Sequence, residues 1–208
     1  RAHPHSSVAV DTDRQMLFVG DNLGIIHGWD ATTGDKTWEV TLDPPTAEGG
    51  ESDIKSTPTV IERHGLVVFG AWSTRVHAMD ALTGREVWAY QAGARIMSSA
   101  AYAPTRDVVY VGAFDKQLHA IAAADGQGVW TFDAGSGILS SPAVSGDEEA
   151  VVFGAYNGLL YAVDTEEGSL MWTHEIGGRV TGSPTLAGDR IYVTAHDGDL
   201  VALRTYSE

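Results

Sequence analysis

The sequence contains no cysteine. A disulfide framework and zinc sites built on thiolates are therefore excluded. Basic residues are also few, because 13 Lys and Arg stand against 28 Asp and Glu and give a formal net charge of −15. Neutralising the phosphates of a nucleic acid requires clustered Lys and Arg, so we expect no nucleic-acid partner.

Long apolar runs are missing as well. No stretch of these residues approaches the roughly 18 that a membrane-spanning helix needs, and the first ten residues do not read as a charged-then-apolar leader. The P-loop, HExxH, GxSxG and EF-hand motifs are also absent from the sequence. We therefore predict a protein that is not an enzyme, with no catalytic residue and no membrane-spanning segment.

The sequence does have a clear period. A tryptophan follows a glycine at the same spacing in four places, namely Trp38, Trp88, Trp130 and Trp172. A glycine that closes an apolar run recurs at the same intervals of 50, 42 and 42 residues, at Gly20, Gly70, Gly112 and Gly154. A fifth unit has Thr194 in place of the glycine and stops before its tryptophan. We predict one domain over residues 1–208, with repeats at about 6–45, 56–97, 98–139, 140–181 and 182–208.

Each of the first four repeats contains four short apolar runs of strand length, separated by turn residues. The second run of each repeat, such as "GLVVFG" or "DVVYVG", is nearly continuous in β-forming residues, which indicates a strand covered on both faces. Repeats of about 42 residues with four strands each are typical of β-propeller blades. The predicted fold is an all-β propeller of about five four-stranded blades. The last blade lacks its fourth strand, so either that blade has three strands or the chain is an arc of a larger propeller.

The turn before each tryptophan has its own chemistry. An aspartate ends the third run at Asp30, Asp80 and Asp164, where its carboxylate can accept hydrogen bonds from the amides of the turn. The glycine that follows supplies a positive φ. The third repeat departs from this pattern, with Ala122 in the aspartate's position. We expect the tryptophan to lie on the outermost strand and to cover the contact with the next blade.

These phrases resemble the PQQ-like (quinoprotein-type) β-propeller repeat. The shared elements are a first strand such as "SSPAV" or "GSPTL", then "VFGAYNGLLYAVD", then a glycine with tryptophan four residues later, and they cover residues 6 to 204. The resemblance implies structural docking roles for Trp38, Trp88, Trp130 and Trp172. A Trp-Asp ending like that of a WD40 repeat occurs only once, at residues 29–30.

The resemblance leaves several functions open. One branch of the family contains non-catalytic, protein-binding scaffolds, similar to the lipoprotein that assists outer-membrane protein assembly or to sensor propellers, and implies a periplasmic or extracellular location. The alternative is a fragment or relative of a PQQ- and calcium-dependent dehydrogenase, for which the family implies a vicinal cysteine pair in many members and calcium-ligating carboxylates. Because the chain has no cysteine and only five units, we expect neither PQQ nor Ca²⁺. A sensor that binds a small ligand is a third possibility.

Three histidines, His27, His77 and His119, share one register in the third run of their repeats. Adjacent sheets pack about 10 Å apart, whereas zinc binds each nitrogen at about 2.0 Å. We therefore expect packed, hydrogen-bonded strand residues and no metal site.

One set of residues is predicted to ring a single face. Turn residues two positions after each glycine landmark, together with arginines from the loops between repeats, form a candidate binding face consisting of Asn22, Trp72, Arg95, Phe114, Tyr156, Arg179 and His196. Aromatic residues and arginine are enriched at binding surfaces. The alternative is that these rings cap the neighbouring blade. The long loop at 43–55 is predicted to reach the same face. The expected partner is another protein or the remainder of a parent propeller.

Overall fold

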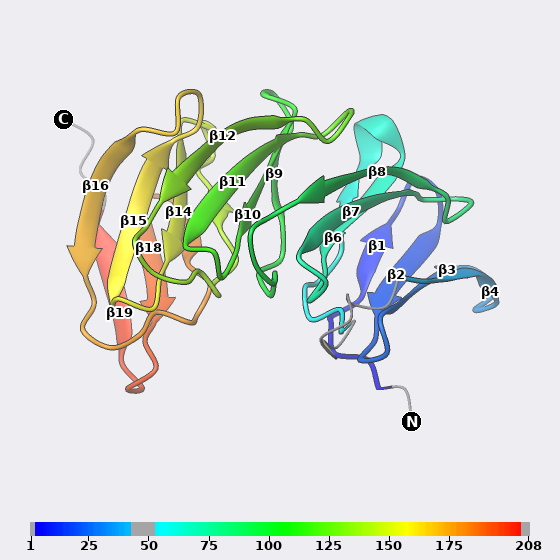
Figure 1. Cartoon of the computed structure of the whole chain (residues 1–208), viewed down its shortest axis with the longest axis horizontal. Helices are drawn as coiled ribbons and strands as arrows, with labels where there is room; N and C mark the ends of the chain where they lie inside the picture. Colours follow the sequence, from blue (N-terminus) through cyan, green and yellow to red (C-terminus); the bar gives the residue numbers. More distant parts are fainter. Residues whose placement is uncertain (1–2, 43–52, 205–208) are drawn as a thin grey trace.

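The computed structural model describes residues 3–42 and 53–204, which form five antiparallel sheets (Figure 1). The prediction of an all-β propeller fold is confirmed. The first sheet consists of β1 (Ala9–Asp11), β2 (Met16–Gly20), β3 (Ile25–Asp30) and β4 (Lys36–Thr41). The second consists of β5 (Thr59–Ile61), β6 (Leu66–Gly70), β7 (Arg75–Asp80) and β8 (Glu86–Gln91), with a short 3₁₀ helix, η1 (Glu62–His64), after β5.

The remaining three sheets follow the same plan. The third consists of β9 (Ala101–Ala103), β10 (Val108–Gly112), β11 (Gln117–Ala122) and β12 (Gly128–Asp133). The fourth consists of β13 (Ala143–Val144), β14 (Ala150–Gly154), β15 (Leu159–Asp164) and β16 (Leu170–Glu175). The last has three strands in the described part of the chain: β17 (Thr185–Ala187), β18 (Arg190–Thr194) and β19 (Leu200–Arg204).

The strands of each sheet pair in chain order, so every sheet is a simple meander. The third and fourth strands of the four complete sheets share one irregularity, a register shift just before the tight turn, between Gly28 and Trp29 in the first sheet and between Ala162 and Val163 in the fourth. A bulge of this kind increases the local twist of the sheet.

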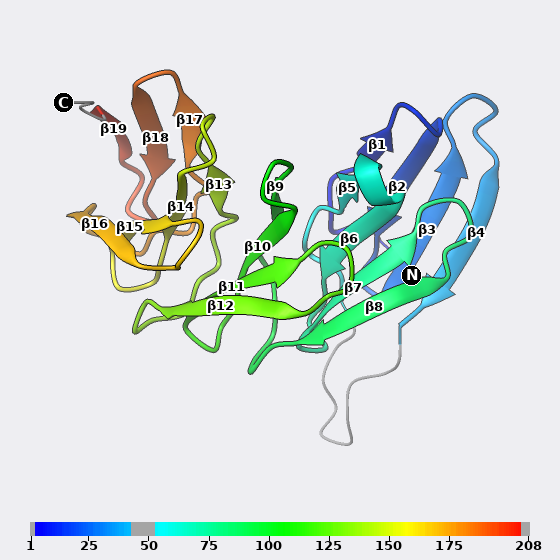
Figure 2. The ribbon, with the colours of Figure 1, turned by 90° about the horizontal axis from the view of Figure 1, so that it is seen from above.

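The sheets stand side by side as blades along an open arc, with the first and last blades at opposite ends (Figures 1 and 2). The first strands of successive blades contact one another, in the order β1, β5, β9, β13 and β17. The sequence allowed either a closed propeller or an arc, and residues 3–42 and 53–204 form an arc (Figure 2). Most of the predicted long loop, residues 43–52, lies outside the described residues.

Four apolar cores lie between neighbouring blades. The core between the second and third blades contains fully buried Val68 and Val76 facing Val109 and Ile121. In the second, third and fourth blades the second strand is covered by a blade on each side and is buried at nearly every position, so its sequence is apolar throughout.

The landmark glycines are needed because the loop leading into the next blade lies directly on them. A Cβ on Gly70 would lie 2.2 Å from Cγ2 of Ile96, and one on Gly112 would lie 2.2 Å from Cγ2 of Ile138. Both isoleucines are fully buried. Any larger residue would displace the loop between blades. The periodic glycine is therefore found where this loop packs too closely on the strand to leave room for a side chain.

A serine satisfies the backbone of each landmark glycine, and it is buried at Gly70, Gly112 and Gly154. The Ser98 hydroxyl donates to the Gly112 carbonyl at 2.8 Å and accepts from its N–H at 2.9 Å. In the last blade the two residue types are exchanged, because a Cβ on Gly182 would lie 2.0 Å from Oγ1 of Thr194. The exchange explains how threonine replaces the glycine there, since its hydroxyl occupies the space that the serine takes in the other blades.

A line of hydroxyl contacts joins all five blades near their first strands. The N–H of Ser7 donates to Oγ1 of Thr57 at 3.3 Å, and the N–H of Thr57 donates to Oγ of Ser99 at 2.9 Å. The same contact continues from Ser99 to Ser141 and from Ser141 to Ser183, each at 2.9 Å. These inter-blade hydrogen bonds fix the lateral register of the arc.

The segment before the first strand runs beside the first blade. Pro4 forms an isolated bridge with Asp21, and the N–H of His5 donates to the carbonyl of Gly20. The segment lies at the opposite end of the arc from the last blade (Figure 1).

Candidate binding face

Five equivalent turns place their second residue on the same face of the arc. The N–H of each of these residues donates to a carbonyl of the segment that leads into its own blade. The pairs are Asn22 with His3, Trp72 with Asp53, Phe114 with Arg95, Tyr156 with Gly137, and His196 with Arg179. These repeated bonds, between 2.9 and 3.1 Å long, hold the five side chains at equivalent places along the arc.

Cations and rings form a continuous row along this face, which we call the cation–aromatic ladder. Lys55 lies with its Nζ atom 3.9 Å from the centre of the Trp72 ring. The guanidinium of Arg95 lies between two rings, 4.9 Å from the centre of Trp72 and 4.3 Å from that of Phe114. The ladder therefore crosses from one blade to the next.

The ladder continues into the fourth blade. The rings of Phe114 and Tyr156 meet edge to face, with their centres 5.5 Å apart. Arg179 lies 5.4 Å from the centre of the Tyr156 ring. Ring contacts of the described residues thus connect five of the seven predicted face residues. They do not reach Asn22 and His196, which lie on equivalent turns at the two ends of the face.

The rings of the ladder are half-buried, whereas Arg95 and Arg179 are exposed. A guanidinium stacked by its flat face keeps its N–H donors pointing outward in the plane of the group, where they can meet a carboxylate. Each cation–ring contact at an exposed position contributes about 0.5–1 kcal/mol. The rings both contact the neighbouring blade and leave part of their surface accessible.

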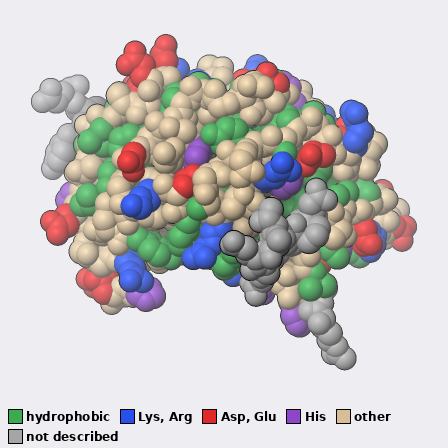
Figure 3. All heavy atoms as spheres, in the orientation of Figure 1, with side chains coloured by type: hydrophobic (Ala, Val, Ile, Leu, Met, Phe, Trp, Pro, Cys, Tyr) green, Lys and Arg blue, Asp and Glu red, His purple; other side chains and the backbone are tan. Residues whose placement is uncertain are grey.

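Lys55 is the member of the ladder that sequence reasoning missed. It lies at the end of the long loop that was predicted to reach this face, but its neighbour in space, Trp72, belongs to the following turn. A signal was present in the composition, because Lys55 is one of only 13 basic residues in a chain with net charge −15. Figure 3 shows acidic side chains spread around the outline of the molecule in that view.

An aspartate beside the ladder is held in its charged form. Burial raises the pKa of Asp115, but hydrogen bonds from His119 and from the N–H groups of Gly93 and Gln117 outweigh that effect and place the pKa below its usual value. The Gly93 contact, at 2.7 Å, ties this turn to the loop that carries Arg95.

The three histidines in equivalent register are hydrogen-bonded strand residues, as predicted. Nε2 of His27 lies 3.2 Å from Asp21, and Nδ1 of His77 lies 2.8 Å from Glu86. His119 contacts Asp115 through Nε2 and the hydroxyl of Tyr90 through Nδ1. Among residues 3–42 and 53–204, no group of three or more His, Asp or Glu side chains is placed to hold a metal ion.

Three of the four repeat tryptophans contact the next blade through the same geometry. The indole N–H of Trp38 donates to the carbonyl of Ala81 at 3.0 Å, that of Trp88 to Ala123 at 2.9 Å, and that of Trp130 to Thr165 at 3.1 Å. Each ring also lies against the glycine of the next blade's turn, where a Cβ would lie 2.6 to 2.7 Å from the ring in Gly84, Gly126 and Gly168.

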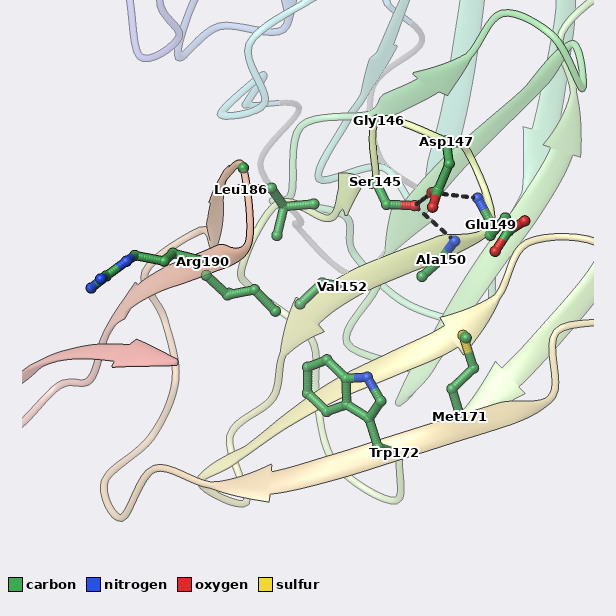
Figure 4. A pocket seen from close by; sticks show the side chains of 12 residues that line it. Ser145, Gly146, Asp147, Glu149, Ala150, Val152, Met171, Trp172, Leu186 and Arg190 are labelled. Carbon is green, nitrogen blue, oxygen red and sulfur yellow. Dashed lines mark hydrogen bonds between the residues drawn. The ribbon is translucent and has the colours of Figure 1, made fainter. Parts of the chain in front are cut away.

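The surroundings of Trp172 are different. A cavity of about 500 Å³ lies beside its ring, between the fourth and last blades (Figure 4). Its lining includes Val152, Met171, Leu186 and Arg190.

Five stacked antiparallel sheets with repeated tryptophan contacts define a β-propeller of PQQ-like repeats. A family profile described as outer membrane protein assembly factor BamB matches residues 2–130 and 114–207. The chain belongs to this family.

Individual relatives resemble this chain over part of longer proteins. The crystal structure of BamB from Moraxella catarrhalis superposes with a TM-score of 0.80 at 24% sequence identity, covering 97% of this chain and 58% of that one. The serine/threonine-protein kinase AfsK of Streptomyces griseus is 33% identical over 81 residues, which is 39% of this chain and 9% of the kinase. The quinohemoprotein alcohol dehydrogenase of Comamonas testosteroni is 32% identical over 75 residues, 35% of this chain and 10% of the enzyme. The matches thus span about a tenth of these two curated relatives.

The described residues contain no helix long and apolar enough to cross a membrane.

Proposed function

We propose that this chain is a non-enzymatic propeller scaffold that presents the cation–aromatic ladder to a protein partner. The observation that supports the proposal is the unbroken row of contacts from Lys55 to Arg179 across three blades. The stacked blades hold the row still, so a partner meets a preorganised surface and little freedom is lost from the scaffold side when it binds.

The chemistry of the ladder favours a partner segment that is both acidic and apolar. The exposed guanidinium edges of Arg95 and Arg179 suit carboxylates, and the half-buried rings suit aliphatic or aromatic side chains. A basic row on a chain of net charge −15 also orients such a segment, because the rest of the molecule repels acidic groups.

The similarity to BamB supports a protein partner, because that relative is described as an assembly factor for outer membrane proteins. On the same basis we propose a periplasmic or extracellular location. Because basic residues are few, we propose no role in binding nucleic acid.

A dehydrogenase function is the alternative. The similarity to the quinohemoprotein enzyme covers 35% of this chain, and the described carboxylates do not form a cluster suited to Ca²⁺. We therefore propose that the protein acts without PQQ or Ca²⁺. Adding both compounds to the purified protein and following thermal unfolding tests this, since a concentration-dependent rise in the melting temperature contradicts it.

A peptide selection tests the scaffold function. Short random peptides displayed on phage are selected on the purified chain and counter-selected on the Arg95→Ser variant. We expect enrichment of sequences that combine Asp or Glu with apolar residues, and affinities about tenfold weaker for the variant. The matched control is Arg75→Ser, an exposed arginine of β7 that contacts Gln91 outside the ladder. Equal binding to the protein and the Arg95→Ser variant, or no enrichment, contradicts the proposal.

A further inference from the structure

One loop position recurs ahead of the blades, and its side chain sets the order of charge along the cation–aromatic ladder. Its carbonyl accepts the N–H of the ladder turn, and the residues at this position in the last four blades are Asp53, Arg95, Gly137 and Arg179. Two arginines therefore flank a loop that has no side chain at this position. Between them lies one uncharged step, at which the rings of Phe114 and Tyr156 meet directly.

The backbone does not require glycine at this uncharged step. The φ of Gly137 is not positive, and a Cβ built on it would lie 3.4 Å from Cδ1 of Phe114, which is an ordinary van der Waals contact. A side chain at this position would lie on the Phe114 ring. Because glycine leaves that place open, an apolar side chain of a ligand can take it and contact the rings of Phe114 and Tyr156.

The two guanidinium groups that flank the step are available to a ligand. Among residues 3–42 and 53–204, no carboxylate lies within ion-pair distance of Arg95 or Arg179. Lys55, the third cation of the ladder, is different because its Nζ atom lies 3.4 Å from the carboxylate of Asp53. The pairing of charges therefore directs an acidic ligand to the two arginines.

The contacts of the ladder limit the separation of these two groups. Cζ of Arg95 lies 4.3 Å from the centre of the Phe114 ring. Cζ of Arg179 lies 5.4 Å from the centre of the Tyr156 ring, and the two ring centres are 5.5 Å apart. In series, these contacts place the two Cζ atoms no more than about 15 Å apart. Because the two loops enter blades that are two steps apart along the arc, the contacts run in one direction and the separation is of this order.

An extended segment of chain matches this spacing. It advances about 3.3 Å per residue, and its alternate side chains lie on the same face. The first and fifth side chains are about 13 Å apart, whereas the first and third are only about 7 Å apart and the first and seventh about 20 Å. A helix needs about nine residues to present three groups over this distance, and isolated helices that short are marginal in water. The spacing therefore favours an extended segment of five residues.

We propose that the ladder binds an extended segment of a partner protein with the pattern acidic–x–apolar–x–acidic. The two carboxylates pair with Arg95 and Arg179, and the apolar side chain lies over Gly137 against the two rings. The residues between them point away from the ladder, so their identity is free to vary. This inference rests on the proposed scaffold function and adds to it a fixed order and spacing of the recognised side chains.

Peptides of one composition and different order test the spacing. The probe TETFTET carries fluorescein at its N-terminus and is titrated with the 208-residue protein at low ionic strength, where exposed charge pairs are screened least, and anisotropy is followed. We expect saturable binding. TEFTTET keeps the spacing of the glutamates but moves the phenylalanine to the opposite face, and TTEFETT brings the glutamates two residues apart. We expect each of these to bind about five- to tenfold more weakly.

Protein variants locate the contacts. Because TETFTET bridges both arginines, we expect Arg95→Gln and Arg179→Gln each to bind it about five- to tenfold more weakly. Arg75→Gln is the matched control, since this exposed arginine lies outside the ladder, and we expect unchanged affinity. Gly137→Leu fills the central step and should reduce the preference for TETFTET over TEFTTET. Circular dichroism establishes that all four variants remain folded.

Three results would overturn the proposed spacing: equal affinity for the three peptides, a loss of affinity in only one of the Arg95→Gln and Arg179→Gln variants, or an unchanged peptide preference in Gly137→Leu. Absence of saturable binding of TETFTET overturns it as well. The phage selection separates these failures from a failure of the scaffold function, because enriched peptides that bind Arg95→Ser more weakly leave that function standing. Without enrichment, both proposals fail together.

Discussion

Replacing Trp130 by alanine removes a ring that joins the third and fourth blades. The indole packs against the Tyr110 ring at 5.5 Å between centres, covers Gly168, and donates a hydrogen bond to the carbonyl of Thr165. Trp-to-Ala changes in cores cost roughly 3 to 5 kcal/mol. Because Trp130 is only partly buried, we expect a loss near the lower end, about 3 kcal/mol.

Two further variants divide this loss into parts. Trp130→Phe keeps most of the apolar contact but loses the hydrogen bond, which costs about 0.5–1.5 kcal/mol. Trp29→Ala is the matched control, because Trp29 contacts Lys36 on its own sheet rather than the next blade, and we expect a loss of about 1 kcal/mol or less.

Urea denaturation followed by far-ultraviolet circular dichroism measures all three variants. Intrinsic fluorescence is less suitable because the substitutions remove a fluorophore. A loss below about 1 kcal/mol for Trp130→Ala, or a loss no greater than that of Trp29→Ala, would refute the assignment of Trp130 to blade docking.

Other expected outcomes concern individual positions. Gly112→Ala should destabilise by about 1–3 kcal/mol through overpacking, and adding Ile138→Ala should recover part of the loss in a double-mutant cycle. The lowered pKa of Asp115 contributes stability that is present above its ordinary value of 3.8 and is lost as the pH falls through the folded value, so Asp115→Asn should flatten the acid limb of a stability–pH curve. Burial raises the pKa of Tyr102 and of Tyr110 to about 12, with help from the Asp107 carboxylate at Tyr102, so ultraviolet titration should show at least two tyrosines ionising well above the ordinary range near 10.

The sequence predicted the blades because their determinants are local. Strand-length apolar runs and glycine turns recur at a fixed period, and period alone specifies a stack of similar sheets. The hydrogen bonds of the turns were predictable for the same reason. Asp30 accepts hydrogen bonds from the N–H groups of Thr32 and Thr33, which are close to it in the sequence.

Contacts between repeats were harder to predict. The period shows that Gly70 is needed but not that Ile96 is the reason, because the two residues meet only after the next blade has folded against the first. In the last blade, Gly182 takes the serine position and Thr194 takes the glycine position. Predicting this exchange from the sequence would require knowing that the two positions are in contact. Of the candidate face, the sequence indicated the rings and arginines, and the structure shows the order in which they stack.

The hydroxyl contacts that run from Ser7 to Ser183 have a direction, because each of the three middle blades donates an N–H to the next blade and accepts one through its own hydroxyl. These three blades therefore offer the same pair of connecting groups, one backbone donor and one hydroxyl acceptor. Deleting residues 98–139, which form the third blade, would place the N–H of Thr57 next to the hydroxyl of Ser141. This contact would be of the same kind as those already present. The contacts between blades are therefore interchangeable, so removing one whole blade leaves a compatible donor and acceptor at the new contact.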